Sequence, residues 1–408
     1  MKLKKWDDFI VENKINMEIP LPNDIIEISD AFIKSGKEIF LVGGAIRDYL
    51  QGKTPHDFDL VTNALPDESK SILKNFNVSD EQGKNFGVLR VYTGDEPKGY
   101  ELASYRKDIS KGRDTKGDEP KVEIGNHITI EDDCKRRDLT INALFYDIKN
   151  KQIVDIVGGV NDIKKGIIRA VGDPVERFNE DRLRILRVFR FTARTGGKID
   201  TKTANAINFD NRLRSNTLGR RDNQPILLPE DNVSQERIWE EILKAWEYPK
   251  TFNKYLSLLT EFNMWPQIFP GSKINTELID SLNFTVLIAN LFKYENTEGL
   301  SEKLVQIYKI PNARNSRYGN ISGEIVFLLN LLKFKPENVL AYYGAKKQCD
   351  IKDSTLLEWI RINKLNNLIK FVYYKPSVSA QELMNKGFSS KRLGDELRRL
   401  EYEKFENE

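Results

Sequence analysis

The chain has 408 residues, of which 39% are hydrophobic and 31% are charged. That balance is typical of a globular protein in water, and the length predicts two or more domains. An integral membrane protein is excluded because no apolar run approaches the roughly 18 residues of a spanning helix. The first residues lack the apolar stretch of a signal peptide, so we expect a cytoplasmic protein with no membrane partner.

The counts of charged and metal-binding residues exclude further classes. The 64 basic and 61 acidic residues leave a net charge of +3, so any RNA contact must come from a local cluster of charge. Cys134 and Cys349 lie in no Cys/His cluster, which excludes a disulfide scaffold and structural zinc. His56 and His127 are too few for a histidine-based phosphohydrolase or triad, so we interpret the His56–Asp57 pair as accidental.

Helical and β-like patterns alternate in the first third of the chain. Residues 39–42 (IFLV) predict a buried strand, Gly43 and Gly44 break it, and residues 45–50 have helical spacing. Further strands are expected at 58–61, 88–92 and 100–103, residues 141–148 fit either a helix or a strand, and residues 108–120 predict a mobile loop. The fold class expected here is an α/β head.

From about residue 176 the spacing of the apolar residues changes to that of helices. Residues 180–194 predict a strong helix that ends at Gly196 and Gly197, and residues 209–233 predict a long loop or insertion. Ser234 is the expected N-cap of another helix, and the pattern stays mostly helical to the end. We therefore expect the head to be followed by an all-helical neck, body and tail.

Asp57 and Asp59 are two residues apart at a predicted strand. On a strand this spacing sends both carboxylates to one face, where they can share divalent cations, as two-metal phosphoryl transfer requires. Just upstream, Gly43 and Gly44 open a helix whose backbone amides can approach a phosphate, with Arg47 as the charged partner. The alternatives are a solvated strand end and an ordinary turn.

Together, residues 41–50 (LVGGAIRDYL) and 57–62 (DFDLVT) resemble the signature of the polymerase-β-like nucleotidyltransferase superfamily. The branch is that of class II tRNA nucleotidyltransferases (CCA-adding enzymes) and poly(A) polymerases. The resemblance implies a mixed-sheet head in which Asp57 and Asp59 bind two Mg²⁺ ions, with Mn²⁺ as the alternative. It also implies a third catalytic acid on a neighbouring strand, which matches Glu101.

Two later motifs imply how the nucleotide is held. Residues 136–144 (RRDLTINAL) match the family's ribose-sensing motif, so Arg137 meets a phosphate while Asp138 and Asn142 contact the ribose hydroxyl. Without the family, the motif predicts a helix start capped by Asp138.

Residues 180–190 (EDRLRILRVFR) match the family's protein template, in which Asp181 and Arg184 read the base edge of CTP or ATP. On a helix these two residues are i and i+3 and share a face. By the same resemblance, Arg187 and Arg190 continue a basic stripe toward phosphates. The alternative is an amphipathic helix with a solvated charged face.

Weaker resemblances extend beyond these motifs. Residues 154–163 and 167–174 resemble the hairpin that links head and neck, and residues 234–244 (SQERIWEEILK) resemble the motif that braces the neck. Residues 386–394 resemble a tail turn, which implies that Lys391 and Arg392 contact tRNA phosphates. The expected domains are a catalytic head (1–150), a nucleotide-recognising neck (151–246) and a tRNA-binding body and tail (247–408).

The expected activity is template-independent addition of CCA to the 3′ end of tRNA, from CTP and ATP. Partial CC- or A-addition, poly(A) synthesis and an idle RNA-binding protein remain alternatives. Residues 83–88 (GKNFGV) resemble the tRNA-specific form more than the poly(A) polymerases, and the loop at 112–120 favours full CCA addition. The sequence does not indicate an oligomeric state.

Overall fold

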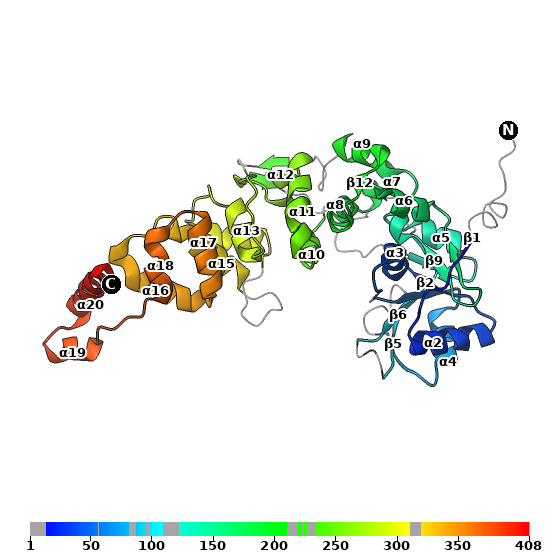
Figure 1. Ribbon diagram of the computed structural model, residues 1–408, viewed down its shortest axis with the longest axis horizontal. Coiled ribbons are helices and arrows are strands. Elements are labelled where there is room, and N and C mark those ends of the chain that lie inside the picture. The colour runs from blue at the N-terminus through cyan, green and yellow to red at the C-terminus, as the bar shows by residue number, and fades with distance from the viewer. Residues whose placement is uncertain are drawn as a thin grey trace. The chain divides into compact units, whose positions relative to one another are not determined.

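The computed structural model describes residues 14–407, except for 56, 81–86, 95, 97, 109–121, 210–218, 222–223, 227–232 and 311–319. The loop expected at 108–120, most of the 83–88 motif, His56 and most of the 209–233 insertion therefore lie outside the described residues. The chain divides into two compact units, Met1–Val233 and Ser234–Glu408 (Figure 1). This single division differs from the three expected domains, whose boundaries stay a prediction.

An eight-stranded mixed sheet forms the centre of the first unit, in the order β1-β10-β9-β2-β3-β6-β5-β4. Its strands are β1 (Lys14–Asn16), β2 (Ile39–Val42), β3 (Asp59–Thr62), β4 (Asn77–Ser79), β5 (Val88–Tyr92), β6 (Tyr100–Ser104), β9 (Phe145–Asp147) and β10 (Gln152–Val154). Strand β10 begins at Gln152, so the sheet continues past residue 150, where we expected the head to end. The predicted α/β head is confirmed.

The centre of the sheet places the first two motifs beside each other. Strand β2 runs antiparallel to β3 with Val42 opposite Asp59, so the end of one strand meets the start of the other. Strand β6 lies on the far side of β3 and runs parallel to it, with Leu60 opposite Leu102. Glu101 therefore enters the sheet next to the Asp59 end of β3.

Helices cover both faces of the sheet. Helices α2 (Asn23–Lys34), α3 (Gly44–Leu50) and α4 (Pro66–Ile72) pack around a core on one face, where Ile25, Phe32 and Ile46 are fully buried. Helix α5 (Ile130–Lys135) covers a second core that includes Val61 and Phe145. In Figure 1, α2 and α4 lie together on one side of the sheet.

The rest of the first unit consists of short elements: β7 (Arg106–Asp108), β8 (Val122–Ile124), η1 (Thr140–Asn142), α6 (Gly159–Lys165), β11 (Ile167–Ile168), α7 (Pro174–Glu180), α8 (Leu183–Thr195), β12 (Lys198–Ile199), α9 (Thr201–Phe209), β13 (Gly219–Arg221) and β14 (Gln224–Ile226). The open question at 141–148 is resolved as a 3₁₀ turn followed by strand β9. Three small strand pairs, β7–β8, β11–β12 and β13–β14, lie outside the main sheet.

The helix expected over 180–194 is wrong at its start. Helix α7 ends at Glu180, and α8 begins at Leu183 and ends at Thr195. Between them Asp181 is extended, with φ −150° and ψ 104°, so it shares no helix face with Arg184. The two helices were merged because apolar residues continue at helical spacing from Phe178 across the break.

The described part of the second unit is helical, which confirms the predicted helical region. Its helices are α10 (Gln235–Trp246), α11 (Pro249–Glu261), α12 (Trp265–Ile268), α13 (Phe284–Leu291), α14 (Leu300–Glu302), the π-helical η3 (Lys303–Ile307), α15 (Ile321–Leu331), η4 (Pro336–Asn338), α16 (Val339–Cys349), α17 (Asp353–Ile362), η5 (Asn366–Leu368), α18 (Ile369–Tyr373), α19 (Ala380–Asn385) and α20 (Ser390–Asn407). Ser234 caps α10 as expected, because its hydroxyl accepts a hydrogen bond from the Arg237 amide. Among the described residues, no helix has the length and apolar character needed to cross a bilayer.

Candidate functional site

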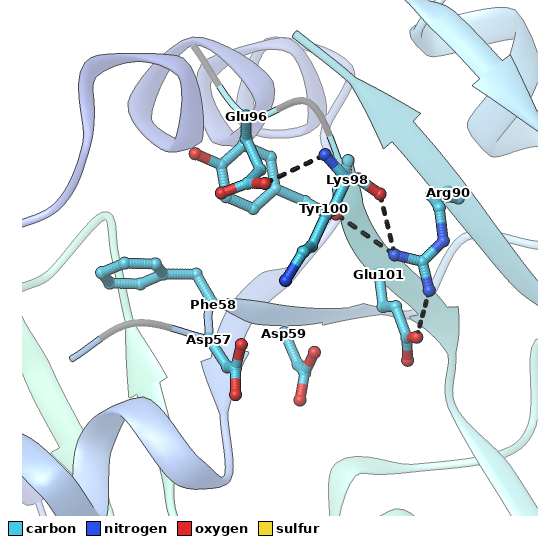
Figure 2. Close-up of a pocket in the computed structure, with 9 residues that line it drawn as sticks. Asp57, Phe58, Asp59, Arg90, Glu96, Lys98, Tyr100 and Glu101 are labelled. Atoms are coloured by element: carbon cyan, nitrogen blue, oxygen red, sulfur yellow. Dashed lines mark hydrogen bonds and ion pairs between the residues drawn. The ribbon is translucent and has the colours of Figure 1, made fainter. Parts of the chain in front are cut away.

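Asp57 and Asp59 line an open pocket of about 610 Å³ in the head. Asp59 is the first residue of β3, and Asp57 lies just before the strand. Figure 2 shows both carboxylates projecting the same way from the chain, as the i, i+2 spacing predicts. Arg90, Glu96, Lys98, Tyr100 and Glu101 complete the polar wall of the pocket.

The surroundings of Asp59 are suited to a cation. Burial and, to a smaller extent, the negative charges of Glu101 and Asp57 raise the pKa of Asp59 to about 6, although Arg137 and Arg90 oppose the rise. No described residue donates a hydrogen bond to either aspartate. The pKa stays raised because the two arginines do not supply enough positive charge to offset burial beside the other carboxylates. The donor set therefore fits a divalent cation, which prefers carboxylate oxygens.

Glu101 lies beside this pair but is held by another partner. Its Oε1 accepts a hydrogen bond from Arg90 Nη2 at 2.5 Å. Within the described residues, no group of three or more acidic, histidine or cysteine side chains is placed to hold a metal ion. The three acids thus lie around one pocket, with two of them open to a cation and the third in an ion pair.

The predicted phosphate turn has the backbone that its glycines allow. Gly43 adopts φ +73°, and its amide donates a hydrogen bond to the Leu144 carbonyl. Arg47 is buried, and its guanidinium donates to Asp48 and lies 5.0 Å from the Phe191 ring centroid. As it lies, Arg47 therefore joins α3 to α8. The expected phosphate contact stays a prediction.

Asn142 connects the glycine turn with the RRD motif. Its Oδ1 accepts a hydrogen bond from Arg47 at 2.5 Å, and its Nδ2 donates to Asp138 at 3.5 Å. Its main-chain carbonyl accepts from Arg137 at 3.5 Å. The glycine turn, the RRD motif and Asn142 therefore form one hydrogen-bonded group within the first unit.

Asp133 supports this group and was not predicted. It is fully buried on α5, with one oxygen bonded to Arg136 and the other to Arg137. Burial raises the pKa of Asp133, but the two guanidinium groups outweigh burial and lower it. Asp133 thereby fixes the direction of Arg137, whose charge reaches Asp59. The signal available in the sequence was an acid three and four residues before two arginines, the spacing of helical ion pairs.

Asp181 and Arg184, which we expect to read the base, lie at the break between α7 and α8. Asp181 Oδ1 accepts from the Leu183 amide at 3.1 Å, so the carboxylate turns toward the start of α8. Arg184 donates to Glu180 Oε2 at 2.7 Å and to the Arg136 carbonyl at 2.9 Å. Arg184 therefore reaches the RRD motif directly, although it shares no helix face with Asp181.

The two remaining arginines of α8 have different surroundings. Arg187 donates to Asp138 Oδ2 at 2.6 Å. Burial raises the pKa of Asp138, but the adjacent Arg187 and the Leu139 amide lower it to about 2. Arg190 is buried with its guanidinium 4.4 Å from the Phe191 ring centroid. Arg190 is therefore largely shielded from solvent, and the expected role of Arg187 and Arg190 in a basic stripe toward phosphates stays a prediction.

Asp48 is a second unpredicted member of the site. Its Oδ1 pairs with Arg47 at 2.8 Å and its Oδ2 with Arg194 of α8 at 3.0 Å. These contacts tie the last turn of α8 to the helix that follows the glycine turn. In the second unit, Lys391 and Arg392 are exposed on the first turn of α20, and their RNA contact stays a prediction.

A profile of the Poly A polymerase head domain matches residues 39–169, which span the glycine turn, all three acids and the RRD motif. The head domain therefore coincides with most of the eight-stranded sheet.

Curated relatives of the head domain carry two different names. Poly(A) polymerase I of Escherichia coli O6:H1 is 34% identical over 243 residues, which cover 58% of this chain and 48% of that protein. The CCA-adding enzyme of Ligilactobacillus salivarius is 40% identical over 188 residues, which cover 46% of this chain and 44% of that protein. The chain thus spans about half the length of these relatives.

The fold is also that of a solved structure. The Thermotoga maritima CCA-adding enzyme complexed with tRNA has a TM-score of 0.63 and 18% identity, and the match covers 100% of this chain and 96% of that one. At this identity the match establishes the fold alone. The predicted relationship to CCA-adding enzymes and poly(A) polymerases is confirmed.

Proposed function

We propose that this chain is a tRNA nucleotidyltransferase that adds CCA to the 3′ end of tRNA from CTP and ATP, without a nucleic-acid template. The observation that carries the proposal is the hydrogen-bonded group around Asn142. It joins the glycine turn to Arg137, Asp138 and the Arg184 end of α8, next to a carboxylate pair suited to a cation.

Asp57 and Asp59 hold the divalent cations in this proposal, two Mg²⁺ ions or their Mn²⁺ equivalents. When bound, the cations lower the pKa of the attacking 3′-hydroxyl and neutralise the triphosphate. The 3′-hydroxyl gives its proton to water, its oxygen attacks the α-phosphorus in line, and the bond from the α-phosphorus to the oxygen that bridges to the β-phosphate breaks as the new oxygen–phosphorus bond forms. Pyrophosphate leaves. The side chains contribute by positioning and charge, as is usual in phosphoryl transfer.

The nucleotide is held along the group around Asn142. The Gly43–Gly44 turn and Arg137 face the triphosphate in this proposal, and the Gly43 amide would exchange its bond to the Leu144 carbonyl for a phosphate oxygen. Asp138 and Asn142 receive the ribose hydroxyl. Asp181 offers an acceptor and Arg184 a fork of donors, a combination that matches the base edges of cytosine and adenine. Because Arg184 now bonds Glu180 and the Arg136 carbonyl, we infer that it exchanges at least one of these contacts for the base.

Incorporation of labelled nucleotides tests the proposal. Full-length protein, Mg²⁺, labelled CTP or ATP and tRNA lacking CCA should yield tRNA extended by CCA. Asp59→Ala should abolish incorporation of both nucleotides, whereas Asp67→Ala, an exposed acid on α4, should not. No incorporation by the unaltered protein would favour an idle RNA-binding protein, and product ending in CC or A alone would favour a partial enzyme.

Base choice needs its own variant. Arg184→Ala should spare Mn²⁺ binding and blur the selection of CTP and ATP. Arg182→Ala is the matched control, because that arginine lies in the same break and bonds Asn179 at 3.0 Å. Unchanged selection in Arg184→Ala would remove Arg184 from base reading.

Poly(A) synthesis is the second candidate, favoured by the 34% identity to Poly(A) polymerase I over 243 residues. A poly(A) polymerase would add long A tails to RNA in the same assay and would ignore CTP. For the second unit we propose a tRNA-binding body and tail, with Lys391 and Arg392 on phosphates. The cytoplasmic location stays a prediction.

A further inference from the structure

Arg90 is fixed at several points in the wall of the pocket. It lies in the middle of β5, and its Nη2 contacts Glu101 Oε1 at 2.5 Å. Its Nη1 donates to the carbonyls of Lys98 at 2.9 Å and Gly99 at 3.3 Å (Figure 2). The turn that joins β5 to β6 therefore orients the guanidinium toward the carboxylate.

The turn is shaped around the side chain of Arg90. Gly99 has φ +68°, and a Cβ added there would lie 2.9 Å from Arg90 Cγ and 3.0 Å from the Val91 carbonyl oxygen. The first contact is closer than real Cβ atoms permit and the second is tight, so the glycine makes room for the stem of Arg90. The ion pair is thus built into the hairpin, unlike a mobile pair between two exposed side chains.

This placement has a consequence for the third acid of the site. One carboxylate oxygen of Glu101 accepts a hydrogen bond from Arg90, and the Glu101 side chain is 51% exposed. A divalent cation and a guanidinium repel each other at contact distance, so both cannot share this carboxylate at low cost. Asp57 and Asp59 have no such competitor among the described residues.

We propose that Arg90 is a positioning residue that holds Glu101 back from the cation site until the pocket is loaded. In the metal-free protein, Arg90 is the resident positive partner of Glu101. Glu101 joins Asp57 and Asp59 only when Arg90 gives up that contact. The inference rests on the proposed function, because it takes those two aspartates as cation ligands.

Mn²⁺ titration of the full-length protein without nucleotide tests the proposal, with free Mn²⁺ followed by electron paramagnetic resonance. Arg90→Gln should lower the dissociation constant for Mn²⁺ roughly two- to fivefold, the range of a partly exposed ion pair. Arg90→Met, which keeps the unbranched stem, should do the same. Thermal unfolding of both variants checks that the head remains folded.

Two comparisons separate the ion pair from the general field of the pocket. Lys98→Gln also removes one positive charge from the pocket wall, and Figure 2 shows the Lys98 amine pointing into the pocket. Within the described residues, that amine forms no ion pair, so its loss should change Mn²⁺ affinity less than Arg90→Gln does. In a Glu101→Gln background, Arg90→Gln should have no larger effect than Lys98→Gln, because only the general field of one positive charge is then lost.

Equal shifts in Arg90→Gln and Lys98→Gln would overturn the proposal, as would an unchanged or weaker affinity in Arg90→Gln. Failure of the proposed function is a separate outcome. If Asp57→Asn left Mn²⁺ binding intact, the cation site itself would be wrong. If the Mn²⁺ shifts occurred as expected while no nucleotide was incorporated, the role of Arg90 would stand and the proposed reaction would fall.

Discussion

Replacing Asp59 by asparagine should stabilise the metal-free protein while removing its cation site. The pKa of Asp59 is raised by burial from the ordinary 3.8 to about 6. A raised pKa means that the folded chain binds the proton more tightly than the unfolded chain. The ionised carboxylate therefore opposes folding above pH 6, and this opposition is lost as the pH falls toward 3.8.

The size of the effect follows from the two pKa values. The difference between 3.8 and about 6 corresponds to about 3 kcal/mol of destabilisation at pH 7.5 and about 1.5 kcal/mol at pH 5. Asparagine has nearly the same shape and never ionises, so Asp59→Asn should recover most of that free energy. In a unit of this size, each kcal/mol raises the unfolding midpoint by about 2 to 4 °C.

Thermal unfolding in EDTA at several pH values measures this effect. Asp57→Asn is the matched control, because Asp57 is exposed and should change stability less, although both variants should lose Mn²⁺ binding. The advantage of Asp59→Asn over the unaltered protein should shrink steadily between pH 6.5 and pH 4. If Asp59→Asn were no more stable than Asp57→Asn at pH 7.5, Asp59 would not be a strained, desolvated carboxylate.

Three further predictions follow from the same contacts. Mn²⁺ binding should weaken about tenfold between pH 7.5 and pH 5, measured by calorimetry, because protons compete for Asp59, whose pKa is about 6; a flat profile would contradict this. Asp138→Asn should lower the free energy of unfolding in urea by about 2 kcal/mol at pH 7, since the pKa of Asp138 is lowered to about 2; the loss should fade between pH 4 and pH 2, where that stabilisation disappears. Replacing Lys391 and Arg392 together by alanine should weaken tRNA binding and lower the slope of log affinity against log salt by the equivalent of about one to two phosphate contacts. An unchanged slope would show that these two residues do not contact the RNA.

Local patterns were sufficient to predict the strands at the centre of the head. Residues 39–42 are a run of mostly buried apolar side chains, and residues 88–92 alternate buried and partly buried side chains around Arg90. Both segments are bounded by polar or glycine residues, so their type depends little on distant contacts. The common direction of the Asp57 and Asp59 side chains was also predictable, because residues two apart at the start of a strand such as β3 point to the same face.

The break between α7 and α8 could not be predicted in the same way. No proline or glycine lies between Phe178 and Leu183, so the apolar period continues without an interruption. The break is stabilised by contacts that are distant in sequence, above all the hydrogen bond from Arg184 to the Arg136 carbonyl. The partners of buried arginines were missed for the same reason, because the contact of Arg47 with Asn142 spans 95 residues.

The position of Asn142 makes it a natural spectroscopic probe. Its side-chain amide contacts Arg47 through oxygen and Asp138 through nitrogen. With selective ¹⁵N labelling of asparagine, the Asn142 side-chain amide would therefore give an NMR signal from a group that lies between Arg47, which we assign to the phosphates, and Asp138, which we assign to the sugar. A ligand that fills either end should move that resonance, so partial occupants such as pyrophosphate and a free nucleoside could be told apart without any turnover.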